Sequence, residues 1–156
     1  MALIAHIISS VLGIVGSYIS SIALFRNAKR GLPLVTKPVR VGMTVAIVGI
    51  VGVAISGVFL FIADPETFLD SGKFLSNMTI MTVLLVTEIS FFVLKKNIYL
   101  VLNRAVSMFS WTWIFVMALW NPPYPYIYFI VGYTISLSII LFVTRKWATE
   151  TFSKPQ

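Results

Sequence analysis

A single carboxylate lies inside a long apolar stretch of this chain. Glu88 belongs to the run TVLLVTEIS, residues 82–90, and lies about 10 Å from Lys95 along a helix that rises 1.5 Å per residue. Its own helix face is apolar, so we expect only hydroxyl partners and a protonated resting form. An acidic residue inside a membrane-spanning segment suggests a functional site, which here would be a proton or cation relay. The alternative is a neutral Glu that hydrogen-bonds a neighbouring helix, or its twin in a dimer.

The predicted partners of Glu88 are Tyr18 and the hydroxyl groups at similar depth on the other segments, which are Ser20, Thr112, Ser136 and Ser138. The first apolar segment also carries a stripe of small and polar residues. One interpretation of this stripe is a thin polar path, and the other is close packing against a second small-residue stripe, residues 42–56. The candidate residues for transport or proton relay are Glu88, Tyr18, Ser17, Ser20 and His6.

Aromatic residues of the last two apolar segments suggest a different kind of site. Trp111, Trp113 and Tyr133 are candidates for binding a flat hydrophobic ligand. The more common role of such residues is to face lipid or to fill gaps between helices, and the Tyr133 hydroxyl needs a partner, which favours an inward orientation.

The remaining chemistry is limited by composition. The chain has no cysteine and one histidine, which argues against thiolate chemistry and multi-histidine metal or haem sites. A nucleophile needs a base within reach, and none is evident. We therefore expect no catalytic residues, no metal and no cofactor. Asn103 and Arg104 are interpreted as residues at the boundary of a segment.

Five apolar segments must position these residues. The chain has 156 residues, of which 58% are hydrophobic and 11% charged, against roughly a quarter charged in a typical soluble protein. Segments of about twenty apolar residues can span a bilayer as helices. The sequence predicts an all-α polytopic membrane protein, a single domain over 1–156 with five transmembrane helices. The spans are expected at about 2–25, 41–62, 77–94, 105–120 and 127–143.

The distribution of charge predicts the orientation. Eleven of the twelve Lys and Arg residues fall in alternate connections or after the last span, and Lys73 alone falls on the other side. The positive-inside rule then predicts an N-out/C-in topology, and Trp120 and Tyr124 mark the outer interface. The first cytoplasmic loop can attract anionic lipid. Because the cations lack interleaved aromatics and a recognisable module, nucleic acid is not expected as a partner.

Parts of the sequence resemble known membrane proteins. The segments HIISSVLGIVG (6–16), SGVFLF (56–61) and GKFLSNMTI (72–80) resemble small, uncharacterised bacterial integral membrane proteins, which are loosely similar to copper-resistance-D-type and cytochrome b561-type bundles. This resemblance implies a helical bundle and brings no established function. In size, span number and tryptophan content the chain is similar to the tryptophan-rich sensory (translocator) proteins, which bind porphyrins and sterols.

These observations lead to three functional hypotheses. The first is a small non-enzymatic transporter or channel-type protein for a proton, ion or small solute. The second is an accessory or assembly subunit of a larger membrane complex, and the third is a binder of a hydrophobic, porphyrin- or sterol-like ligand. The expected partners are the lipid bilayer and either further copies of the chain or other membrane subunits. The expected location is the cytoplasmic (inner) membrane of a prokaryote.

Overall fold

Helices make up almost the whole chain. A computed structural model describes residues 1–69, 71–119 and 125–153, so Trp120, Tyr124 and Lys154 lie outside the described residues. Five of the helices are long and apolar enough to cross a membrane, which confirms the prediction of an all-helical chain with five such segments. In chain order, the helices are α1 (Ala2–Lys29), α2 (Lys37–Ala63), the short α3 (Pro65–Leu69), α4 (Gly72–Phe91), α5 (Asn97–Leu119) and α6 (Tyr126–Phe152).

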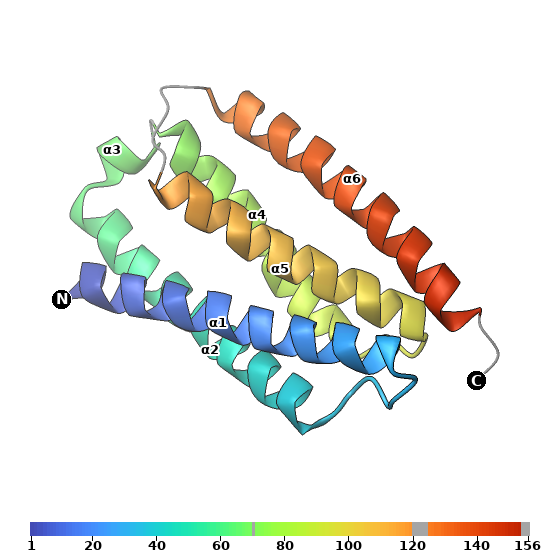
Figure 1. Ribbon diagram of the computed structural model, residues 1–156. Helices are drawn as coiled ribbons and strands as arrows, with labels where there is room; N and C mark the ends of the chain where they lie inside the picture. Colours follow the sequence, from blue (N-terminus) through green and yellow to red (C-terminus); the bar gives the residue numbers. More distant parts are fainter. Residues whose placement is uncertain (70, 120–124, 154–156) are drawn as a thin grey trace.

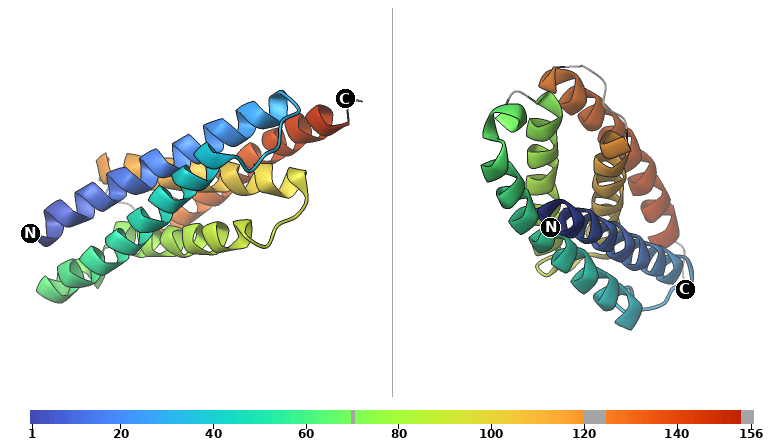
Figure 2. Two further views of the ribbon diagram at one scale, coloured as in Figure 1. Left: turned by 90° about the horizontal axis from the view of Figure 1, so that it is seen from below. Right: turned by 90° about the vertical axis from the view of Figure 1, so that its left-hand side faces the viewer.

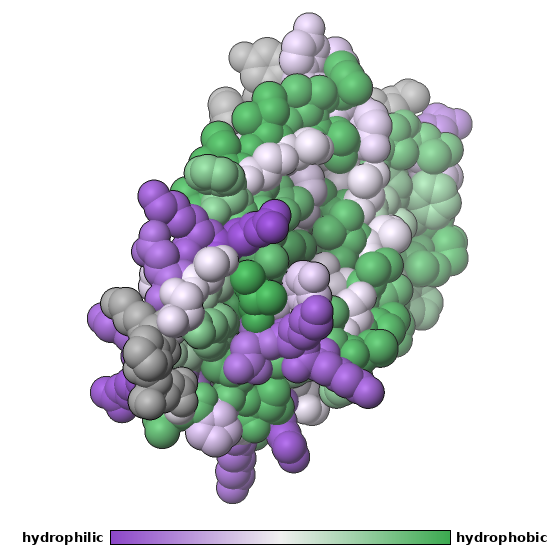
Figure 3. All heavy atoms as spheres, turned by 90° about the vertical axis from the view of Figure 1, so that its right-hand side faces the viewer, coloured by the Kyte–Doolittle hydropathy of each residue, from purple (hydrophilic) through white to green (hydrophobic). Residues whose placement is uncertain are grey.

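The five long helices run in alternating directions and form one bundle (Figure 1). The N-terminus of α1 and the end of α6 lie at opposite ends of this bundle, and α6 lies along its edge beside α5 (Figures 1 and 2). The end of α1, the 92–96 connection and the end of α6 therefore share one end, which we call the basic end. Seen from that end, hydrophilic side chains project from a largely hydrophobic surface (Figure 3).

Local sequence explains where several helices begin and end. Gly31 has a φ of 66°, a left-handed conformation that glycine adopts without strain just after a helix. Pro38 occupies the first turn of α2, where its missing N–H costs no helical hydrogen bond. Ser71 caps α4, because its side chain accepts a hydrogen bond from the Phe74 backbone N–H at 3.3 Å.

Helices α1 and α2 pack with their backbones in contact, more extensively than any other pair. A Cβ atom added to Gly16 would overlap the backbone at Ala46, and one added to Gly49 would overlap the backbone of Gly13. This confirms the predicted packing of the two small-residue stripes and is typical of helix pairs in membrane proteins.

The helix boundaries differ most from the predicted spans at the start of α5 and at the end of α6, which runs to Phe152 where the sequence predicts an end near 143. Helix α4 ends at Phe91 and α5 begins at Asn97. The sequence predicts a span from about 105 and leaves open whether residues 95–104 are helical or lie on the membrane surface. Lys95 and Lys96 lie in the break between the two helices, but Arg104 does not. The placement of Arg104 at a segment boundary is therefore wrong, because it lies two turns inside α5 and is fully buried.

Two apolar clusters fill the bundle at different depths. One lies toward the basic end, and its members are Leu24, Ala28, Leu34, Val39, Met43, Phe91, Leu100, Val101 and Ala148. The other lies further along the helices, and its members are Ile50, Val53, Leu84 and Trp111. The layer between them contains the charged residues of the interior.

Candidate functional site: a buried ion pair between α4 and α5

Glu88 of α4 and Arg104 of α5 form a bidentate ion pair inside the bundle. Arg104 Nη2 donates to Glu88 Oε2 at 2.9 Å, and Nη1 donates to Oε1 at 3.2 Å. The side chains of Glu88 and Arg104 are 1% and 0% exposed, respectively. The planar guanidinium matches the two carboxylate oxygens, and such charge-assisted pairs are among the strong hydrogen bonds of proteins.

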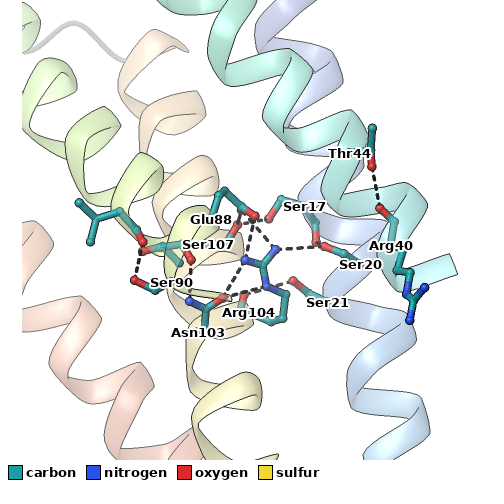
Figure 4. Close-up of polar contacts among 12 residues, drawn as sticks. Ser17, Ser20, Ser21, Arg40, Thr44, Glu88, Ser90, Asn103, Arg104 and Ser107 are labelled. Atoms are coloured by element: carbon teal, nitrogen blue, oxygen red, sulfur yellow. Dashed lines mark hydrogen bonds and ion pairs between the residues drawn. The ribbon is translucent and has the colours of Figure 1, made fainter. Parts of the chain in front are cut away.

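A chain of serine hydroxyls points at the same carboxylate (Figure 4). Ser107 donates to Glu88 Oε1 at 2.6 Å. The Oγ atoms of Ser17 and Ser107 lie 2.8 Å apart. Because a hydroxyl has one proton and that of Ser107 is directed at Glu88, Ser17 must donate to Ser107. The two hydroxyls therefore align toward the carboxylate and connect α1 to the pair.

The guanidinium is surrounded on its other sides as well. Asn103 Oδ1 accepts from Nε and Nη2 of Arg104 at 3.1 and 2.7 Å, and Ser20 Oγ lies 3.5 Å from Nη1. The Asn103 amide is itself fixed, because its Nδ2 donates to the Thr87 carbonyl at 2.7 Å. The centre of the Phe91 ring lies 4.7 Å from the guanidinium carbon, a distance at which cation–π attraction operates.

Apolar side chains enclose the ion pair on two sides, and we call this a closed position. Phe91 and the rest of the cluster toward the basic end lie on one side of it, and Leu84 and Trp111 of the second cluster lie on the other. Glu88 precedes the end of α4 by three residues and Arg104 follows the start of α5 by seven, which puts both within about 10 Å of the helix ends at 1.5 Å per residue. Apolar side chains thus separate the pair from both ends of the bundle.

The expectation that Glu88 would meet only hydroxyl groups is wrong. Its main partner is a guanidinium from the next long helix. The signal that could have placed Arg104 inside the bundle comes from its neighbours on α5. Asn103, Ser107 and Ser110 recur at i, i+4 and i+7, and all three are buried. Such a polar stripe indicates a face turned into the bundle.

The predicted relay residues are brought together only in part. Ser17 and Ser20 join the network around the pair, as described above. Tyr18 makes a separate contact with α5, where its hydroxyl is 2.8 Å from Thr112 Oγ1. His6 lies near the other end of α1, where its Nδ1 is 3.0 Å from Ser56 Oγ. Polar residues of α1 therefore contact both α2 and the ion pair, and His6 has no part in the latter.

The three residues suggested for a hydrophobic ligand do not line one site. Trp111 is fully buried against α1, where a Cβ on Gly13 would overlap its ring. Trp113 and Tyr133 pack on each other between α5 and α6, with ring centroids 5.8 Å apart. The Tyr133 hydroxyl lies 2.7 Å from Ser110 Oγ, which agrees with the expected inward orientation. A ligand site at these residues stays a prediction.

The part of the chain that the structure describes offers few side chains that could bind a metal ion together. No three histidine or acidic side chains there come close enough to hold an ion. Comparison with known proteins adds no assignment, since no family model, curated protein or solved structure matches the chain. The geometry of the ion pair is therefore the basis for a functional proposal.

Proposed function

We propose that this chain is an integral membrane protein whose basic end faces the cytoplasm, in the inner membrane of a prokaryote. The support is the arrangement of charge on five apolar helices. Lys95 and Lys96 lie at the basic end together with the basic residues that end α1, while Glu66 and Lys73 lie at the opposite end. A cytoplasmic excess of Lys and Arg is the usual determinant of such an orientation.

We propose further that the protein moves a proton, an ion or a small solute across the membrane, with Glu88 as the titrating group. The observation that carries this proposal is the bidentate pair of Glu88 and Arg104, held between two apolar clusters. Charged residues are costly in the apolar part of a membrane and are concentrated along transport pathways. A closed position between apolar layers is the arrangement expected of an occluded state.

The proposed working step is a change in the charge of this pair. A proton that reaches Glu88 would neutralise the carboxylate and leave Arg104 buried without a counter-charge. Breaking a buried pair in this way costs about 3–5 kcal/mol. A free-energy difference of this size is comparable to the one that shifts an equilibrium between two conformations almost completely. The protein would then favour an arrangement in which Arg104 gains water or an anion.

Proteoliposomes containing a pH-sensitive dye test this proposal. Under an imposed proton gradient, wild-type protein should change the internal pH faster than empty vesicles, and Glu88→Gln should abolish the difference. Thr82→Val is the matched control, because Thr82 is an exposed residue of the same helix and should leave flux unchanged. Flux that is unchanged in Glu88→Gln, or wild-type protein that passes no ion or solute, would contradict the proposal.

A second candidate function is that of an accessory or assembly subunit. The observation in its favour is that the ion pair links three helices, since α1, α4 and α5 all contribute hydrogen bonds to it. In that case the same network serves only to hold the bundle together. Intact-complex mass after gentle purification separates the two: fixed partner chains favour the subunit, whereas an oligomer of this chain alone favours the transporter.

A further inference from the structure

A groove of about 630 Å³ runs along the outer surface of α1 and ends at the connection to α2. The part nearer the middle of α1 is apolar, with Ile14, Val15, Ile19 and Ile22 among the lining residues. The part at the end of α1 is polar and basic, and the lining residues there include Arg26, Asn27, Arg30 and Thr36. One groove thus combines an apolar slot and a cationic end.

The cationic end is available for a ligand. Arg26 and Arg30 are both exposed, one helical turn apart on the same face of α1. Neither guanidinium forms a salt bridge with an acid in the part of the chain that the structure describes. Two unpaired guanidinium groups at this spacing are well suited to a phosphate group.

The wall of the groove is held in place by the chain itself. Asn27 Nδ2 donates to the Leu34 carbonyl at 3.3 Å and to Thr36 Oγ1 at 3.0 Å. Leu34 is buried under the connection, which fixes this segment against α1. The groove is therefore preformed, so a ligand need not order the loop when it binds.

We propose that this groove binds one anionic phospholipid. Its phosphate would contact Arg26 and Arg30, and an acyl chain would lie against Ile14, Ile19 and Ile22. The proposal rests on charge complementarity and on the apolar slot directly adjoining the cations, at the level where headgroup and acyl chain meet in a membrane. It requires the membrane insertion proposed above but is independent of transport.

Native mass spectrometry of the full-length protein, titrated with phosphatidylglycerol or phosphatidylcholine, tests the site. Wild-type protein should retain phosphatidylglycerol in preference, and Arg26→Gln/Arg30→Gln should weaken its binding about tenfold or more. Lys95→Gln/Lys96→Gln removes the same charge from another loop at the same end and should change binding less than about twofold. Equal losses in the two double variants would indicate general attraction to charge and would overturn the site.

A variant of the apolar slot keeps the test decisive if the arginine variant fails to fold. Ile19→Trp fills the groove at an exposed position without changing charge and should also weaken phosphatidylglycerol binding. Inorganic phosphate should not compete at concentrations comparable to the lipid. Unchanged lipid binding in Ile19→Trp, or displacement of the lipid by phosphate alone, would overturn the proposal.

Discussion

Glu88 and Arg104 are sixteen residues apart in the chain and lie on different helices, yet both carboxylate oxygens accept hydrogen bonds from the one guanidinium. The pair is enclosed, and its remaining hydrogen-bonding groups are met by serine and asparagine side chains. The stability of the protein should therefore respond to substitutions in this network in a defined order, separately from any effect on transport.

Removing one partner of the pair should destabilise the protein more than removing both. Glu88→Leu or Arg104→Met alone leaves an unpaired buried charge, which costs about 3–5 kcal/mol, whereas the double variant replaces the pair with apolar groups and should recover most of this loss. Equilibrium unfolding of the purified protein in mixed micelles measures the difference. A double variant no more stable than the single ones would show that the hydrogen bonds around the pair dominate.

The serine chain should show a graded effect. Ser107→Ala removes a hydrogen bond to a charged group and should cost about 1.5–3 kcal/mol, and Ser17→Ala, one step further from the carboxylate, should cost less. Ser138→Ala is the control, since Ser138 is exposed and donates to the Thr134 carbonyl of its own helix. The same unfolding measurement ranks the three variants, and equal effects at Ser107 and Ser138 would contradict the assigned network.

The contact of α1 with α2 should not tolerate a Cβ at its centre. Gly16→Ala places a methyl group against the backbone of α2 and should destabilise the protein by about 1–3 kcal/mol or more, the usual cost of overpacking. Gly57→Ala is the matched control on α2, because its Cβ would meet only a His6 ring atom at 3.8 Å. Thermal unfolding should separate them, and similar melting temperatures would argue against backbone contact.

The absence of cysteine from the sequence makes orientation directly testable by labelling. In intact cells, a membrane-impermeant maleimide should modify Glu66→Cys, which lies on the exposed surface of α3. Lys96→Cys, at the exposed connection before α5, should react only after the membrane is permeabilised, because the basic end is expected to face the cytoplasm. The reverse pattern would contradict the proposed orientation.

The helical fold was predictable from the sequence because long apolar runs and small-residue stripes are local signals. The partner of Glu88 was not predictable, because the ion pair joins two different helices and produces no periodic pattern in the sequence of α4. The sequence misplaces Arg104 for a related reason: Arg104 follows Lys95 and Lys96 closely in the chain, and this closeness suggests a third cation at the segment boundary. The buried polar spacing of Asn103, Ser107 and Ser110 was the one local indication that this part of α5 turns inward.

The touching backbones of α1 and α2 also bear on how the molecule can move. Gly16 lies directly against the backbone of α2, and Gly49 lies directly against the backbone of α1. If either helix moved along the other, the side chains beside these glycines would clash with the opposite backbone. In the proposed transport cycle, this pair of helices would therefore stay rigid, and the displacement would fall on α4 and α5. These are the two helices that carry the opposite charges of the buried pair, so one rocking motion between them would both break the pair and open the layer around it.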